Sequence, residues 1–123
     1  MPNTAEILSA YGRAWGATDE NKRRELLESC WNLRGVYQDP SSDIHGREAL
    51  VEHIGNQHSA FPGSRVELTS GFTEHHGKIQ FNWQFVTSSG EVAIEGVDFG
   101  TLGDDGKLVQ IVGFFGPPPP LPE

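Results

Sequence analysis

The stretch EVAIEGVDFGTLGDDGKLVQIVGFF (residues 91–115) decides the fold. Two runs rich in Val, Ile and Phe, residues 91–102 and 107–115, flank a short turn-type segment that contains Gly. Runs of this composition favour β-strands, and so short a link joins antiparallel neighbours. The stretch therefore predicts two adjacent antiparallel strands.

Two more β-rich runs precede this pair. They are SRVELTSGFTE (residues 64–74) and KIQFNWQFVTS (residues 78–88), and the short segments HHG and SSG separate the successive runs. Because each link is short and contains Gly, each predicted strand must lie beside the next one in the sequence. The second half of the chain therefore predicts a four-stranded antiparallel meander.

The first half of the chain has helical periodicity. Apolar residues recur every three to four positions over residues 4–16, 19–31 and 47–60, whereas VYQDP (residues 36–40) predicts a short strand. Helices followed by strands indicate an α+β fold. We expect three N-terminal helices packed on one face of a strongly curved, mainly antiparallel sheet.

Length and composition limit the class of protein. The 123 residues fit one domain, expected over residues 1–116, with a Pro-rich tail at residues 117–123. The formal net charge of −8 disfavours a nucleic-acid or anionic-membrane partner. Cys30 is the only cysteine, and the sequence shows neither a signal peptide nor an apolar run of membrane-spanning length. A cytoplasmic location is therefore expected.

Asp98 interrupts an apolar strand pattern. Strand alternation places it on the same face as Val92 and Ile94, which we assign to the interior that the helices cover. An unpaired buried charge costs several kcal/mol, so burial should raise the pKa of this carboxyl group. A neutral carboxylic acid can donate a hydrogen bond or act as a general acid near neutral pH. Alternatively, the side chain caps a turn or faces solvent and has no chemical role.

Three other polar residues are predicted near the same interior space. Tyr11 lies in the apolar stripe of the first helix, His58 follows Ile54 by one turn in the third helix, and Asp39 ends the short strand. Each also has a structural interpretation: an edge-on core ring for Tyr11, a hydrogen-bonded core residue for His58, and turn formation before Pro for Asp39. No metal site is predicted, because the adjacent histidines at 75–76 lack a nearby third ligand.

A wall of apolar side chains is expected around these polar groups. Aromatic rings facing the interior would suit a flat, apolar, ring-bearing ligand. The predicted ligand-binding residues are Trp15, Ile54, Phe81, Trp83, Ile111 and Phe115.

The other face of the sheet is also partly apolar. Val97 and Phe99 alternate with Asp98 on one strand, and Val112 and Phe114 lie on the outer face of the last strand. Together they would expose a larger apolar patch than monomers usually tolerate. The sequence therefore predicts a homodimer that forms through this face.

Several motifs, in this order, resemble a known superfamily. They are AYGRAWGATD (residues 10–19), VYQDP followed by HGREALVEHI (residues 45–54), FPG (residues 61–63) and GVDFGTLGDDGKLVQIVGFFG (residues 96–116). The chain resembles the nuclear transport factor 2-like superfamily, which has the cystatin-like cone fold. Within this superfamily it is similar to the SnoaL-like and ketosteroid isomerase-like branches.

The resemblance implies roles for the polar residues. In ketosteroid isomerases a helix Tyr and a protonated strand Asp form an oxyanion hole, and a second Asp in a DP dipeptide moves the proton. These roles fall on Tyr11, Asp98 and Asp39. In SnoaL-like polyketide cyclases a strand Asp near the position of Asp98 is the acid/base and a His assists it. Here the strand before Asp98 offers Trp83 and Gln84 in place of the matching His, and His58 could take its role only from the helix.

Three functions remain open at this stage. The first is a cofactor-independent enzyme that acts on a small apolar carbonyl compound as an isomerase, cyclase or dehydratase. The second is a non-catalytic module that binds a small hydrophobic ligand, and the third is an oligomerisation or scaffold domain. Paired interior carboxylates favour the enzyme, whereas an outward-facing Asp98 would favour the other two.

Overall fold

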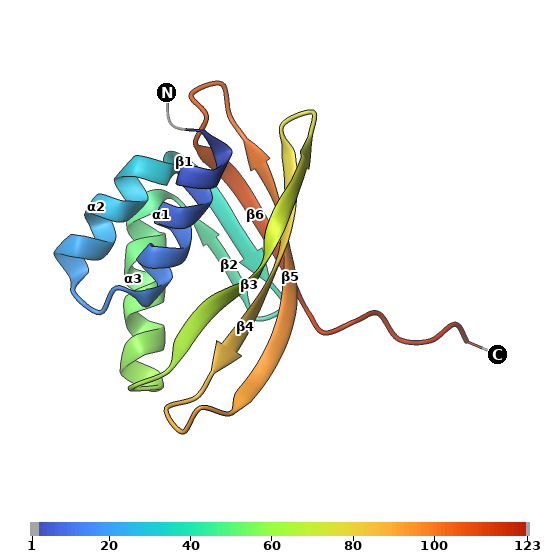
Figure 1. Ribbon diagram of the computed structural model, residues 1–123. Coiled ribbons are helices and arrows are strands. Elements are labelled where there is room, and N and C mark those ends of the chain that lie inside the picture. The colour runs from blue at the N-terminus through green and yellow to red at the C-terminus, as the bar shows by residue number, and fades with distance from the viewer. Residues whose placement is uncertain (1–2, 123) are drawn as a thin grey trace.

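The computed structural model describes residues 3–122, which form three helices and six strands (Figure 1). In chain order the elements are α1 (Thr4–Gly16), α2 (Glu20–Cys30), β1 (Trp31–Asp39), β2 (Ser42–His45), α3 (Arg47–Ala60), β3 (Arg65–His75), β4 (Lys78–Val86), β5 (Val92–Leu102) and β6 (Leu108–Phe115).

The six strands form one sheet, in the order β2-β1-β6-β5-β4-β3. All neighbours are antiparallel except β1 and β6, which run parallel. The sheet curves around the three helices, which lie on its concave side (Figure 1). The predicted α+β fold and the meander of β3 to β6 are confirmed.

Helix α1 supplies much of the core and begins at a side-chain cap. The Asn3 side chain accepts a hydrogen bond of 2.9 Å from the Glu6 backbone N–H, which satisfies one of the unpaired amides at the helix start. The buried face of α1 includes Ile7, Tyr11 and Trp15. Tyr11 and Trp15 therefore point from α1 toward the sheet.

Arg23 of α2 ties the helices together. Its side chain is 3% exposed and donates to the backbone carbonyls of Ala17 (3.1 Å), Thr18 (3.2 Å) and Val51 (3.1 Å). Ala17 and Thr18 follow α1, and Val51 belongs to α3. A buried charge is tolerated where carbonyl dipoles satisfy its donors, so this guanidinium fixes three helical segments relative to one another.

The structure corrects the predicted boundaries around the first strand. Helix α2 ends at Cys30, and β1 begins at Trp31 rather than at Val36. Trp31 is fully buried and stacks on Tyr11, with ring centroids 5.7 Å apart and planes 15° apart. Apolar periodicity alone placed Trp31 at the end of the helix, because a buried Trp at this position fits the end of a helix and the start of a strand equally well. Strand β2 was not predicted.

Two residues of the meander lie on the opposite face from the predicted one. Simple alternation from Val112 and Phe114 predicts Leu108 on the outer face. Leu108 is instead fully buried, because the β5–β6 pairing shifts register between Thr101 and Leu102 and reverses the alternation. Val92 is 43% exposed, because the β4–β5 pairing shifts between Phe85 and Val86. Bulges of this kind also bend a sheet, in agreement with its curvature.

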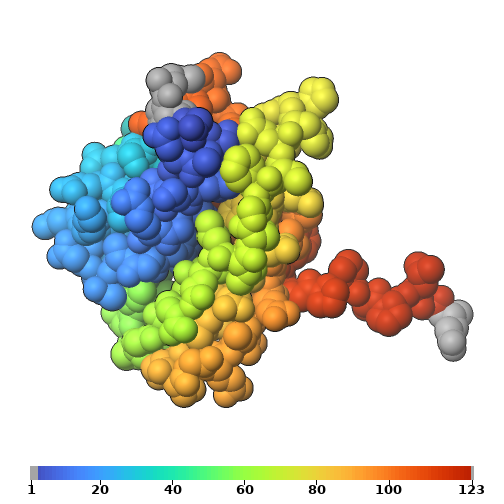
Figure 2. All heavy atoms as spheres, viewed as in Figure 1, coloured from blue at the N-terminus to red at the C-terminus, as the bar shows by residue number. Residues whose placement is uncertain are grey.

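The segment of residues 117–122 follows β6 and carries no regular secondary structure. It projects away from the body of the molecule (Figures 1 and 2), and Leu121 is 92% exposed. None of the helices formed by residues 3–122 combines the length and the apolar character that a membrane crossing requires.

Candidate functional site

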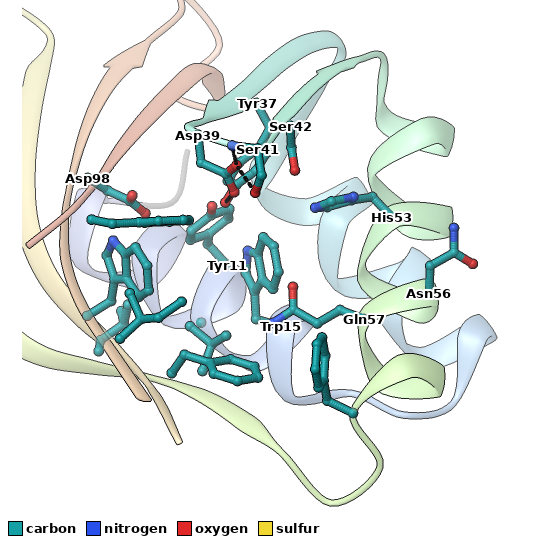
Figure 3. Close-up of a pocket in the computed structure, with 18 residues that line it drawn as sticks. Tyr11, Trp15, Tyr37, Asp39, Ser41, Ser42, His53, Asn56, Gln57 and Asp98 are labelled. Atoms are coloured by element: carbon teal, nitrogen blue, oxygen red, sulfur yellow. Dashed lines mark hydrogen bonds between the residues drawn. The ribbon is translucent and has the colours of Figure 1, made fainter. Parts of the chain in front are cut away.

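A cavity of about 440 Å³ opens between the inner face of the sheet and the helices (Figure 3). Its walls come from α1, α3, strand β1 with the turn into β2, and strands β3 to β6. This volume lies within the range of sites for small organic molecules. Most of the wall is aromatic or aliphatic, and the polar groups are few.

Asp98 of β5 lines this cavity and is only 6% exposed. Burial raises the pKa of its carboxyl group to about 7, and the negative charge of Asp39 acts in the same direction. The indole N–H of Trp83 opposes the shift, but neither Trp83 Nε1 nor Asp98 Oδ1 has a partner in hydrogen-bonding geometry. The carboxyl group is therefore partly protonated at neutral pH and keeps an unused hydrogen-bonding atom.

Gly113 makes room for this carboxyl group. It is the cross-strand partner of Asp98, and a Cβ at Gly113 would lie 2.6 Å from Asp98 Oδ1 and 3.6 Å from the Asp39 Cβ. Since heavy atoms do not approach that closely without displacement, no larger residue fits here unchanged. The missing side chain leaves space between two carboxylic acids from β1 and β5.

Asp39 both forms a turn and lines the cavity. One carboxylate oxygen accepts from the Tyr37 hydroxyl (2.7 Å), and the other accepts from the backbone N–H (2.9 Å) and hydroxyl (3.2 Å) of Ser41. The bonds to Ser41 are the predicted turn chemistry before Pro40. The side chain is also part of the cavity wall, so the structural and functional interpretations are compatible.

Tyr11 lies at the base of the cavity. Its hydroxyl group is buried and has no hydrogen-bond partner. Burial, with a smaller contribution from the charge of Asp98, raises the pKa of Tyr11 well above its ordinary value. The group therefore stays protonated, and its O–H has no acceptor among the described residues.

The predicted ligand-binding residues divide into two sets. Trp15, Trp83 and Phe115 line the cavity, with the Trp83 and Phe115 rings 5.7 Å apart in an edge-on arrangement. The Trp83 ring covers its cross-strand partner Gly96, where a Cβ would lie 2.2 Å from the indole. The other set does not reach the cavity and packs in the core beneath it: Ile54, Phe81 and Ile111.

His58 does not reach the cavity. Its Nε2 atom lies 2.8 Å from the Trp15 backbone carbonyl oxygen, and His58 is not among the residues that line the cavity. The helix turn that follows Ile54 therefore points His58 at the end of α1 rather than at Asp98. The structure thus places His58 in a structural contact.

Three polar residues of α3 and one of β1 line the cavity but were not predicted. They are His53, Asn56, Gln57 and Tyr37. The His53 ring stands edge-on to Trp15, and burial lowers its pKa against the opposing effect of Asp39. Strand alternation from Asp39 could have revealed Tyr37, whereas the polar residues of α3 break no pattern in the sequence.

Within residues 3–122, no group of three or more His, Cys, Asp or Glu side chains is arranged to hold a metal ion. Apart from the two indoles, the polar side chains that line the cavity supply two carboxyl groups, two phenols, one imidazole, two aliphatic hydroxyls and two amides.

A protein-family model described as the SnoaL-like domain matches residues 9–111. The chain belongs to the SnoaL-like domain family. The match spans every helix and strand from α1 to β6, at least in part, and confirms the resemblance that the sequence motifs indicated. No curated protein sequence matches the chain significantly.

Solved structures with the same fold support this assignment. A proposed isomerase of the SnoaL-like family from Agrobacterium tumefaciens is 27% identical, with a TM-score of 0.84 over 90% of this chain and 95% of that chain. A proposed SnoaL-like polyketide cyclase from Jannaschia sp. is 14% identical, with a TM-score of 0.66 over 94% and 88% of the two chains.

A third similar structure contains a small molecule. It is a hypothetical protein with a ketosteroid isomerase-like fold from Catenulispora acidiphila, in complex with trimethylamine. It is 13% identical, with a TM-score of 0.71 over 89% of this chain and 85% of that chain.

The cavity of this SnoaL-like domain combines two kinds of group. Tyr11 and a protonated Asp98 can donate hydrogen bonds to an oxygen atom, and the Asp39 carboxylate can accept a proton. Donors and a base around a mainly apolar space are the groups that stabilisation of a developing enolate requires.

Proposed function

We propose that this SnoaL-like domain is a cofactor-independent enzyme that acts on a small apolar carbonyl or ring-bearing compound by acid–base chemistry, as an isomerase or a cyclase. One observation carries this proposal. Two buried polar atoms without partners, the Tyr11 hydroxyl and Asp98 Oδ1, belong to side chains that line an apolar cavity together with the Asp39 carboxylate.

The proposed mechanism gives each residue one task. The substrate carbonyl oxygen accepts hydrogen bonds from Tyr11 and from protonated Asp98, so that the charge of the enolate is stabilised as it develops. Asp39 removes a proton from the carbon next to the carbonyl and returns it at another position, or leaves a carbanion that closes a ring. The aromatic wall formed by Trp15, Trp83 and Phe115 holds the substrate rings.

A second function, binding without turnover, has its own support. The Asp39 carboxylate already accepts three hydrogen bonds, from Tyr37 and Ser41, so both of its oxygen atoms are engaged in the turn. A SnoaL-like domain in which Asp39 only forms the turn would hold a small hydrophobic ligand without changing it. A scaffold role lacks such support, since the cavity is open and its polar groups are free to bind a ligand.

The test is exchange of α-protons. Cyclic ketones such as 2-tetralone are incubated with the protein in D2O, and the loss of the α-proton signal is followed by NMR. We expect Asp39→Asn to slow exchange by about 10²- to 10⁴-fold, because the amide cannot accept the proton. Asp98→Asn should bind nearly as well, since the amide still donates a hydrogen bond, but it should slow exchange, because an amide stabilises the developing enolate less than a carboxylic acid does. Asp98→Ala should impair both binding and exchange.

Asp104→Asn is the matched control, because Asp104 is an exposed acid in the β5–β6 turn. It should exchange at the parental rate. If Asp39→Asn and Asp98→Asn also exchange at the parental rate, the acid–base mechanism is wrong and the binding function takes its place.

A further inference from the structure

The cavity has a second polar end, built by one face of α3. His53, Asn56 and Gln57 are spaced by three and four positions, so their side chains lie on the same side of the helix. All three line the cavity. Figure 3 shows them across the cavity from Asp98, with Trp15 between the two ends; His53 and Gln57 extend toward Trp15, and Asn56 lies farther out, at the rim.

These three side chains are not occupied by the protein itself. His58, in the same helix, bonds the Trp15 carbonyl, but within residues 3–122 no hydrogen bond involves the side chains of His53, Asn56 or Gln57. His53 and Gln57 are half-buried and Asn56 is exposed at the rim. Polar groups that face a binding cavity without a protein partner are satisfied by water or by a ligand.

The charges of the cavity wall restrict what such a ligand can carry there. Among the 18 residues that line the cavity there are two aspartates and no lysine or arginine. A carboxylate or phosphate would therefore meet no cation, and it would be repelled by the Asp39 carboxylate. Asn and Gln side chains each offer donors and an acceptor, which suits a hydroxyl or an amide.

We propose that the cavity binds elongated compounds with two polar ends. A carbonyl oxygen lies at the Tyr11 and Asp98 end, and the rings lie against the aromatic wall. At the other end an uncharged hydroxyl or amide group bonds Gln57, next to Asn56 at the rim. This inference rests on the proposed function for the first end and adds a specificity site at the second.

The test uses matched phenols whose oxygen imitates an enolate oxygen. Calorimetric titration compares 2,6-dihydroxynaphthalene with 6-methyl-2-naphthol, in which a methyl group of similar size replaces the second hydroxyl. The pair 4,4′-dihydroxybiphenyl and 4′-methylbiphenyl-4-ol repeats the comparison at a greater length. A symmetric diol can bind in two equivalent orientations, which alone gives it a twofold advantage. In at least one pair we expect the diol to bind about fivefold tighter than its methyl analogue beyond this factor.

Variants of α3 test whether its side chains cause the tighter binding of the diol. The double variant Asn56→Leu/Gln57→Met should bind the diol and the methyl compound equally well, apart from the factor of two. The control Gln80→Met, which changes an exposed Gln of β4, should keep the full preference. A probe with a carboxylate in place of the second hydroxyl, 6-hydroxy-2-naphthoic acid, should bind more weakly than the diol.

Each contrary result would overturn a specific part of the proposed binding mode. If no diol is preferred at either length, or if the preference survives in the double variant, the second polar end is wrong. Binding of the naphthoic acid as tightly as the diol would show that the ligand end is charged. If none of the phenols binds, the enolate site of the proposed function fails, and this inference fails with it.

Discussion

Asp98 occupies a position that opposes folding whenever its carboxyl group is ionised. Its folded pKa is about 7, against an ordinary value of 3.8, mainly because of burial. Between about pH 4 and pH 7 the folded protein keeps a proton that the unfolded chain has lost. The free energy of unfolding therefore decreases as the pH rises through this window, and this group adds no further dependence below or above it.

Asp98→Asn should remove this dependence. Because the amide cannot ionise, we expect the variant to be more stable than the parent above pH 7, by on the order of 3 kcal/mol, and to lose that advantage as the pH falls toward 4. Urea denaturation from pH 4 to pH 8 measures the difference. The exposed control Asp104→Asn should follow the parent throughout. A constant difference between Asp98→Asn and the parent at all pH values would contradict the raised pKa.

Single residues of the cavity were predictable only where they broke a pattern. Asp98 was found because a carboxylate interrupts an apolar strand, and Tyr11 because it sits in an apolar helical stripe. His53 and Gln57 follow no such break, since polar residues are expected on a surface helix. Their role depends on how far α3 stands from the sheet, and this distance is set by the packing of the whole domain.

Among the elements, the three helices depend on one buried side chain. Arg23→Met should lower the free energy of unfolding by about 2–4 kcal/mol, because the carbonyls of Ala17, Thr18 and Val51 lose their donors in a buried place. Chemical denaturation measures the loss. The neighbouring Arg24 is a matched control, since it forms exposed ion pairs with Glu20 and Glu48, and Arg24→Met should change stability little. If both substitutions lowered the free energy of unfolding equally, the buried hydrogen bonds of Arg23 would not be what holds the helices together.

Element order and type were predictable because they follow from local periodicity. The α1 and α3 boundaries are the predicted ones, and the four meander strands lie where the β-rich runs and short Gly turns placed them. Strand β2 was missed because four residues carry too weak a pattern. The register shifts near Leu108 and Val92 could not be predicted, because each depends on the pairing with another strand.

On the scale of the whole molecule, the outer face of the sheet is unpartnered. Phe99 and Phe114 are 43% and 51% exposed, and their rings pack edge-on with centroids 6.0 Å apart. Val97 and Val112 are half-buried beside them. We keep the proposal that a second copy of the chain covers this face, because exposed aromatic clusters of this kind favour association.

Sedimentation tests the proposed dimer. We expect the parent chain to sediment as a dimer at micromolar concentration and Phe114→Glu to sediment as a folded monomer, since a charge would be buried at the interface. Leu121→Glu, in the exposed tail, is the control and should remain dimeric. A parent chain that is a stable monomer at this concentration would contradict the proposal.

The placement of the tryptophans gives the domain a built-in optical signal. Of its three tryptophans, Trp15 and Trp83 border the cavity, whereas Trp31 is sealed beneath Tyr11. A molecule that enters the cavity changes the surroundings of two indoles and leaves the third as an internal reference. Ligand entry should therefore quench or shift only part of the emission, and Trp83→Phe should separate the two responsive indoles. Unlabelled protein can thus be screened for its natural ligand by fluorescence alone.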